Sequence, residues 1–280
     1  MAKMIVVLLF LVVSISALLI WGRLSWSQYT TNLSEKVMNR AIETQEVVDL
    51  DEVDELPSPV KKYFHHVLKK GQPIISKVFI SQNGGFRAKP EMAGWSEMKA
   101  VQYFSSEPRA FVWDSQIFIL PLVSINVCDS YIDGKGSMTG KFLSLFTLID
   151  SHDEEELNAG ALQRYLAEAV WFPTSLLPSQ GISWEEIDSS KAKATITDSG
   201  ITVSLEFEFN ERGEAVSVYT PGRYREVKGK YELTPWKGRF SNYIEVEGYR
   251  IPTKAEVEWH LKDKTYPYWK AELIEVRYDS

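Results

Sequence analysis

The carboxylate with the most suggestive neighbours in this 280-residue chain is Glu168. It lies four residues after Arg164 and three before Trp171, so a helix would place all three side chains on one face. If that face looks into a cavity, such a carboxyl group can act as a general acid or anchor a ligand. The alternative is an exposed ion pair with Arg164, which contributes about 0.3–0.5 kcal/mol. The sequence favours the ion pair.

A second group of chemically capable side chains is formed by Asp150, His152 and Asp153. Together they could activate a hydroxyl or bind a metal, but no further ligand or nucleophile motif accompanies them in the sequence. Acidic side chains also suit the start of a helix, so we expect these residues to cap the helix that follows. His65 and His66 would point about 100° apart on a helix and could not bind one metal from that helix alone.

The glycine-rich segment Gly134–Lys141 looks at first like a phosphate-binding loop. That motif requires four residues between its glycines and a Ser or Thr directly after the lysine, whereas Phe142 follows Lys141 here. Asp133–Gly134 is instead a strong signal for a hairpin turn. The sequence therefore predicts no cofactor and no metal, and it leans against an enzyme.

Aromatic residues are plentiful, with nine Trp, 13 Tyr and 13 Phe in the chain. Aromatic stripes on strands usually belong to the core. A subset could still line a pocket for an acyl chain, because ligand pockets are mostly apolar with few polar groups. With Arg164 and Glu168, the candidate ligand-binding residues are Trp113, Phe118, Trp171, Phe172, Tyr243, Trp259 and Trp269, and Trp236 belongs to the same aromatic set.

One long amphipathic helix, over Glu154–Ser179, must position the first of these groups. Its apolar residues share one broad face at about 100° per residue, and Pro173 ends the helix. Such a face predicts a helix that lies on a sheet, with Arg164, Glu168 and Trp171 on the opposite side. The apolar residues are Leu162, Tyr165, Leu166, Ala169, Val170 and Phe172.

Most of the remaining chain alternates between apolar and polar residues, most clearly over 201–209. This alternation indicates antiparallel strands with one buried and one solvated face. We expect about eleven strands, with a turn at Asn83–Gly85. The predicted fold class is α+β, with a large curved antiparallel sheet (a half-barrel) crossed by the long helix. The strands are expected from Ile74 and at 86–89, 95–105, 110–118, 120–133, 138–148, 192–197, 201–209, 215–219, 236–246, 250–261 and 268–278.

The amino-terminal segment Met4–Trp21 is apolar except for Ser14 and Ser16. Roughly 20 apolar residues span a bilayer, whereas the apolar region of a cleaved signal peptide usually has about 7–15. We therefore predict an uncleaved signal anchor whose contact with membrane lipid is this segment, with Trp21 and Trp26 at the interface. A stalk helix over Thr31–Val48, an acidic linker and a helix that starts at Ser58–Pro59 are expected next. The predicted units are the anchor (1–23), the stalk and linker (24–56) and the α+β domain (57–280).

The net charge of −7 argues against a nucleic-acid partner, which requires a basic face. Orientation in the membrane stays open. Lys3 lies on one side of the anchor and Arg23, Lys36 and Arg40 on the other, which slightly favours a cytoplasmic domain. A short tail before a single anchor, followed by a large β domain, favours export, and we expect the domain outside the cytoplasm.

Four segments resemble, in order, an uncharacterised bacterial family of membrane-associated proteins: Asp129–Phe146, Arg164–Ser179, Thr234–Tyr243 and Gly248–Leu261. The G-Y-R-I-P-T start of the last segment is also similar to the periplasmic lipoprotein-carrier and sorting-factor superfamily. That resemblance implies a curved half-barrel, plugged by helices, around an apolar cavity. It suggests hydrophobic ligands and supplies no catalytic residues.

Three functions follow as hypotheses. The first is a membrane-anchored, non-catalytic domain that binds or carries a lipid or another apolar ligand at the bacterial cell envelope. The second is a structural or protein-interaction module that docks an envelope protein through an exposed Trp171. The third is a hydrolase or transferase that uses Glu168 or the group Asp150, His152 and Asp153.

Overall fold

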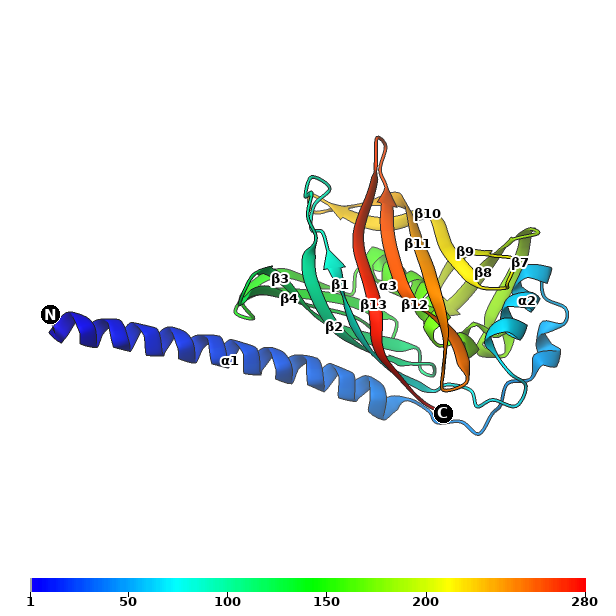
Figure 1. Cartoon of the computed structure of the whole chain (residues 1–280), viewed down its shortest axis with the longest axis horizontal. Helices are drawn as coiled ribbons and strands as arrows, with labels where there is room; N and C mark the ends of the chain where they lie inside the picture. Colours follow the sequence, from blue (N-terminus) through cyan, green and yellow to red (C-terminus); the bar gives the residue numbers. More distant parts are fainter. Residues whose placement is uncertain (1) are drawn as a thin grey trace.

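This computed structural model describes residues 2–280, in which 13 strands form one continuous antiparallel sheet. The order β6-β5-β4-β3-β2-β1-β13-β12-β11-β10-β9-β8-β7 pairs the first strand with the last at the middle of the sheet. The sheet curves around a central helix (Figure 1), which confirms the predicted α+β class. The strands are β1 (Lys77–Phe86), β2 (Ser96–Ser105), β3 (Ala110–Leu120), β4 (Val123–Ile132), β5 (Lys135–Phe142), β6 (Phe146–His152), β7 (Ile182–Asp188), β8 (Lys191–Asp198), β9 (Ile201–Phe209), β10 (Ala215–Val227), β11 (Lys230–Val246), β12 (Tyr249–His260) and β13 (Thr265–Asp279).

The strand boundaries correct three predictions. The expected turn at Asn83–Gly85 lies inside β1, where a Cβ on Gly84 would come within 1.9 Å of the Lys270 carbonyl oxygen. The glycine therefore permits close approach of β13 rather than a turn. The single strand expected over 138–148 is two strands, β5 and β6, joined by a turn, and β7 is a strand that the sequence did not predict.

The central helix α3 (Glu155–Glu168) is shorter than predicted. After it the chain continues through the 3₁₀ turns η2 (Ala169–Trp171), η3 (Pro173–Leu176) and η4 (Pro178–Gln180). Pro173 has no N–H for the Ala169 carbonyl, which accepts a bond from the Phe172 N–H instead, at 3.1 Å. The proline thus ends the regular helix one turn earlier than the apolar pattern suggests.

Aromatic rings fill the space between this helical segment and strands β2 and β3. Phe104 lies 4.7 Å from Phe172, between ring centroids, and both contact Tyr165 edge-on. Leu162 and Leu166 of α3 are fully buried in the same core. The enclosed apolar hollow that we expected beneath the crossing helix is therefore replaced here by close-packed side chains.

A second plug, the helix α2 (Ser58–Val67), covers the far end of the sheet with the short turn η1 (Leu50–Val53). Tyr63 and Phe64 on its apolar face are fully buried and contact rings of β7 and β9. The helix starts at Ser58–Pro59 as expected, but Pro57 precedes it and no side chain, including that of Ser58, caps it.

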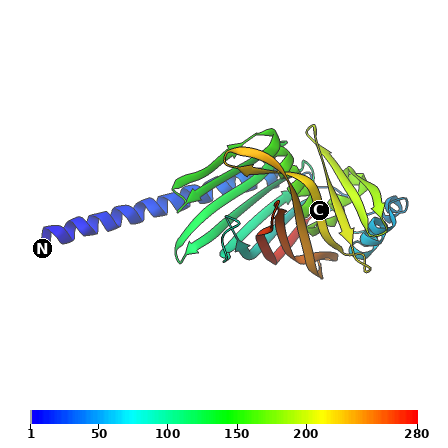
Figure 2. The ribbon, with the colours of Figure 1, turned by 90° about the horizontal axis from the view of Figure 1, so that it is seen from above.

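The amino-terminal helix α1 (Ala2–Arg40) runs without a break past the apolar segment, so the expected stalk helix is its continuation and ends at Arg40. It is long and apolar enough to cross a membrane, and its apolar stretch projects away from the sheet (Figures 1 and 2). Trp26 is buried against the outer face of β3 and β4, where its indole Nε1 donates to Asp114 at 3.0 Å. Its predicted place in an interfacial belt is therefore wrong.

Charged groups hold the carboxy-terminal end of α1 to the turn between β4 and β5. Arg40 and Lys36 both pair with Asp133, at 2.7 and 3.1 Å. Their bonds lower the pKa of Asp133 to about 2. The carboxylate therefore stays ionised, and the contact is kept, across the physiological pH range.

Candidate functional site

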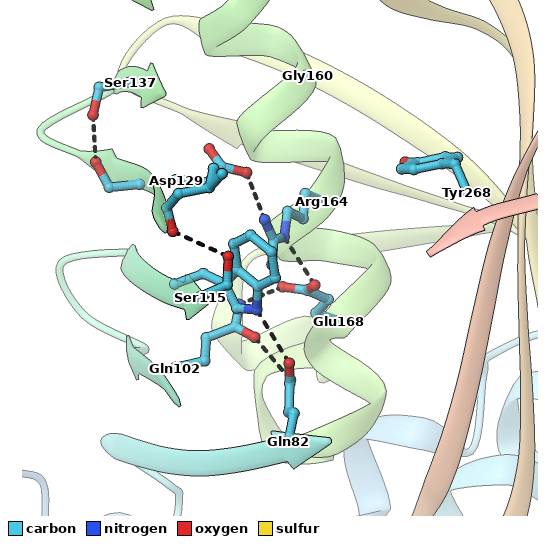
Figure 3. A network of polar contacts seen from close by, with 12 residues as sticks. Gln82, Gln102, Ser115, Asp129, Ser137, Gly160, Arg164, Glu168 and Tyr268 are labelled. Carbon is cyan, nitrogen blue, oxygen red and sulfur yellow. Dashed lines mark hydrogen bonds and ion pairs between the residues drawn. The ribbon is translucent and has the colours of Figure 1, made fainter. Parts of the chain in front are cut away.

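The centre of the concave face holds a buried network of polar side chains around Arg164 (Figure 3). Arg164 extends from α3 and donates through Nη1 to Asp129 of β4 and through Nε to Glu168, the latter at 2.9 Å. The second oxygen of Glu168 accepts a hydrogen bond from the Gln102 amide at 2.8 Å. One guanidinium thus bridges two carboxylates from different elements.

The network continues across the sheet through two glutamines. The Gln82 amide nitrogen donates to Gln102 at 3.1 Å, and the Gln82 amide oxygen accepts from the Trp113 indole, also at 3.1 Å. These residues occupy inward positions of the adjacent strands β1, β2 and β3. Polar side chains at buried strand positions need such partners, because an unpaired buried polar group costs about 1–3 kcal/mol.

Burial sets the electrostatics of the Arg164–Glu168 pair. Their side chains are only 14% and 12% exposed, so the predicted surface ion pair is wrong: the pair forms, but inside the protein. The Arg164 guanidinium also lies 4.9 Å from the Trp113 ring centre. Burial raises the pKa of Glu168, while the bonds from Arg164 and Gln102 act in the opposite direction.

Because both oxygens of Glu168 accept hydrogen bonds, this carboxylate is positioned to hold α3 on the sheet. A general acid directs its proton at a substrate, whereas both Glu168 oxygens face protein donors, Arg164 and Gln102. Burial opposes the charge of Arg164, but Glu168 and Asp129 raise the pKa of its guanidinium above the ordinary value. The network is therefore a buried cluster of one guanidinium and two carboxylates, with one carboxylate in excess.

A second arginine, Arg223, faces α3 from the opposite wing of the sheet. It follows the irregularity after Thr220 on β10, and its Nη2 donates to the Gly160 carbonyl of α3 at 3.0 Å. Its guanidinium lies 4.7 Å from the centre of the Trp236 ring. Within residues 2–280 no carboxylate forms an ion pair with Arg223, and burial lowers the pKa of its guanidinium. Four of its five N–H donors have no protein acceptor in this part of the chain.

Aromatic rings surround this guanidinium. The Trp236 indole donates to the Tyr268 hydroxyl at 3.0 Å, and Trp259 stacks on Tyr268 with ring centres 5.8 Å apart. We call Arg223, Trp236, Trp259, Tyr268 and Trp269 the concave aromatic face. Apolar side chains of the same core that remain partly accessible include Phe86, Ile125, Met138, Val257 and Leu261.

The structure separates the predicted ligand-binding residues into groups. Trp113 joins Arg164 and Glu168 in the buried network, and Trp259 and Trp269 belong to the concave aromatic face. Phe118 points to the outer face, where it lines a cleft beside Trp26 of α1.

Three other predicted residues lie away from both groups. Trp171 is 1% exposed, so its predicted role as an exposed docking residue is wrong. Phe172 is part of the closed core. Tyr243 lies near α2, and its hydroxyl donates to the Ala215 carbonyl at 2.9 Å.

Several residues of the site were missed in the sequence. Gln82 and Gln102 stand at strand positions where the alternation predicts a buried apolar side chain. A polar residue at such a position was a signal in the sequence for a buried polar network. Arg223 follows Pro221–Gly222, a pair that suggests a turn, and only the pairing of β10 with β11 shows that the strand continues.

The predicted cap of the central helix is also wrong. Asp150 and His152 belong to β6, where they bond each other at 2.6 Å and are largely exposed, while Asp153 pairs with Lys135. The helix begins after Glu154 without a side-chain cap. Because β6 stays extended through His152, Asp150 and His152 cannot fold back on the helix, and Asp153 accepts a hydrogen bond from the Asn158 side-chain amide, at 3.3 Å, rather than from the helix backbone. No cluster of three His, Cys, Asp or Glu side chains suited to a metal occurs among the described residues.

Comparison with known proteins places the chain in a family. Its fold is similar to the crystal structure of a LolA superfamily protein from Nitrosomonas europaea, with 13% identity, 80% of this chain and 93% of that chain covered, and a TM-score of 0.33. No curated protein matches the sequence. Residues 54–278 match a family described as a family of unknown function, DUF6920. The chain therefore belongs to this family of unknown function.

Proposed function

We propose that this protein is a membrane-anchored domain that binds a lipid, or a similarly apolar molecule with an anionic group, on the concave face of its sheet. The observation that carries the proposal is Arg223, a guanidinium among aromatic rings with no carboxylate partner in the described chain. Arg223 is half-buried, and a charge that loses part of its contact with water without gaining a counter-ion is unfavourable. An anionic ligand group would supply that counter-ion through charge-assisted hydrogen bonds.

The surroundings of Arg223 suit the apolar part of such a ligand. Trp236 and Trp259 lie beside the guanidinium but are only 3% and 8% exposed, so the accessible apolar surface next to it comes from the half-buried rings of Tyr268 and Phe86. Ligand sites are mostly apolar, with few polar groups that fix orientation. Since the space beneath α3 is filled, the proposed site is this open face and not an enclosed cavity.

The proposal includes anchoring of the protein in the membrane by Met4–Trp21, with the sheet outside the cytoplasm at the cell envelope. The exposed apolar stretch of α1 supports the anchor. Among the alternatives, catalysis by Glu168 lacks support because hydrogen bonds occupy both of its oxygens. Docking through Trp171 lacks support because that side chain is buried.

Native mass spectrometry of the detergent-extracted full chain tests the proposal. We expect a lipid to co-purify with the wild-type protein and its occupancy to fall at least about tenfold in Arg223→Gln, since a charge-assisted hydrogen bond contributes about 1.5–3 kcal/mol. Arg277→Gln is the matched control, because Arg277 is 63% exposed on the outer face and should leave occupancy unchanged.

Stability measurements separate binding from folding in the same variant. Arg223 has no carboxylate partner to lose among residues 2–280, so Arg223→Gln should be at least as stable towards urea as the lipid-free wild type. Absence of co-purifying lipid from the wild type, or equal occupancy in Arg223→Gln, would contradict the proposal.

A further inference from the structure

We propose that the ends of the β3–β4 and β5–β6 hairpins form a second membrane contact, which inserts into the bilayer surface beside the point where α1 emerges. The inference rests on the proposed anchoring of α1, and it adds a lipid-facing surface on the sheet itself. We call this surface the hairpin tips. Its residues are Ile119, Leu120, Leu122, Phe146 and Leu148.

The hairpin tips expose large apolar side chains to an unusual degree. Leu122 is 83% exposed, and Leu120 and Phe146 are each 62% exposed. The two hairpin ends are neighbours, because the Leu143 N–H donates to the Ser124 carbonyl at 2.9 Å. Contiguous exposed apolar surface in a folded protein usually marks a protein or membrane interaction site.

The backbone of these turns gives a second, independent observation. Leu122 has φ +67° and Leu143 has φ +52°, in the left-handed region that favours glycine or asparagine. A leucine at such a position is strained, and Gly would relieve the strain at a hairpin end. Leucine thus occupies turn positions at which the backbone conformation favours glycine or asparagine.

Contacts with α1 fix the position of the hairpin tips along the helix axis, beside the end of the apolar stretch. Gly22, which directly follows the apolar stretch, packs so closely on the β5–β6 turn that a Cβ there would lie 2.6 Å from Leu145 Cδ2. Figure 1 shows the β3–β4 hairpin reaching back along α1 towards the amino terminus. If Met4–Trp21 spans the bilayer, the turn beside Gly22 lies at its surface.

Moving from the hairpin tips along the sheet, the surface changes from apolar to polar side chains, which matches the change from acyl chains to headgroups at the surface of a bilayer. A cleft of about 390 Å³ lies between α1 and the outer face of β3 and β4, and Arg23, Trp26, Gln116 and Asn126 help to line it. Arginine suits the depth of lipid phosphates, while leucine and phenylalanine suit the acyl boundary. With a net charge of −7, insertion of apolar side chains is the better explanation than attraction to anionic lipid.

Site-specific fluorescence on the full chain in phosphatidylethanolamine–phosphatidylglycerol nanodiscs tests the inference. Leu122→Cys and Phe146→Cys are each labelled with an environment-sensitive dye; the native Cys128 is 1% exposed and does not compete for label. Ile187→Cys is the control, because Ile187 is also an exposed apolar residue, on β7 at the end away from the amino terminus (Figure 1). We expect blue-shifted emission at positions 122 and 146, quenched at least twofold by lipids brominated near the headgroup, and no quenching at 187.

A further variant, Leu11→Cys in the middle of the apolar stretch, is measured with lipids brominated near the ends of their acyl chains and distinguishes the two proposals. Quenching at position 11 but not at 122 or 146 overturns the inference and leaves the anchor intact. No quenching at any of the three positions overturns the anchor, and the inference with it. A blue shift at 122 or 146 that grows with protein concentration and resists brominated lipid indicates contact between protein copies and also overturns the inference.

Discussion

Two arginines on the same concave face have opposite electrostatic situations. Arg164 is neutralised by Asp129 and Glu168, so its burial is compensated within the protein. Arg223 has only the Gly160 carbonyl and the face of Trp236. The network around Arg164 has one carboxylate in excess, and Arg223 is an unpaired cation within residues 2–280, so these two charges offset each other only over a longer distance. An anionic ligand in direct contact with Arg223 would attract it more strongly than either carboxylate does, because Coulomb attraction weakens with distance. This asymmetry makes Arg223 the functional candidate and Arg164 the structural one.

Replacing Arg164 should therefore destabilise the fold in a pH-dependent way. Arg164→Met leaves two buried carboxylates without a counter-ion, which should lower the free energy of unfolding by about 3–5 kcal/mol at pH 7.5. Burial already raises the pKa of Glu168, and loss of the guanidinium removes an opposing effect. A carboxyl group whose folded-state pKa is raised destabilises the fold as pH rises, so the variant should regain stability at pH 5.

Urea unfolding of Arg164→Met at the two pH values, followed by tryptophan fluorescence, checks this expectation. The double variant Arg164→Met, Glu168→Gln should lose less stability than the single variant, because one uncompensated charge is gone. A loss below about 1 kcal/mol that does not change with pH would instead match an exposed ion pair.

At the scale of elements, local patterns in the sequence were enough for the fold class. The alternation over 201–209 predicts β9, and Asp133–Gly134 predicts the β4–β5 hairpin. Gly84 misled the prediction because its role is set by β13, almost 190 residues away along the chain. The spacing of Arg164 and Glu168 predicted their pairing but not their burial, which depends on Asp129 and Gln102. Partners distant in sequence carry the information that local patterns lack.

The role assigned to Gly84 has a direct consequence for the centre of the sheet. Gly84→Ala forces a methyl group against the backbone of β13 and should lower the free energy of unfolding by about 1–3 kcal/mol. Gly94→Ala is the matched control, since a methyl group at Gly94 would have no atom within 4 Å, and its effect should stay within about 0.5 kcal/mol. Equal urea midpoints for the two variants would show that β1 and β13 do not meet closely at Gly84.

At the scale of the whole molecule, the amino-terminal helix α1 packs directly on the sheet. Residues 26–40 of α1 pack on the outer face of β3 and β4, while the apolar stretch continues beyond them. The partly buried Trp26–Asp114 hydrogen bond and the pairing of Arg40 with Asp133 hold this part of the helix at two points. The concave face therefore keeps a fixed orientation relative to the proposed membrane, which a flexible stalk would not provide.

Trp26→Ala should release α1 from the sheet without unfolding the sheet. The side chain is 5% exposed and contributes both packing and the hydrogen bond to Asp114, whose pKa is raised by burial. A large-to-small change at such a contact costs about 3–5 kcal/mol, so amide exchange over residues 26–40 should accelerate by about 100-fold or more. Exchange in β9 should not change, since that strand does not touch α1.

Hydrogen exchange measured by mass spectrometry on the full chain in nanodiscs gives this comparison. Trp21→Ala is the matched control on the same helix, because Trp21 is 63% exposed and makes no contact with the core that Trp26 shares with β3 and β4. We expect Trp21→Ala to leave exchange over residues 26–40 unchanged. If the two variants behave alike, the helix is held by its ends only, and the orientation of the concave face relative to the membrane is set by the Asp133 ion pairs and the Gly22 contact instead.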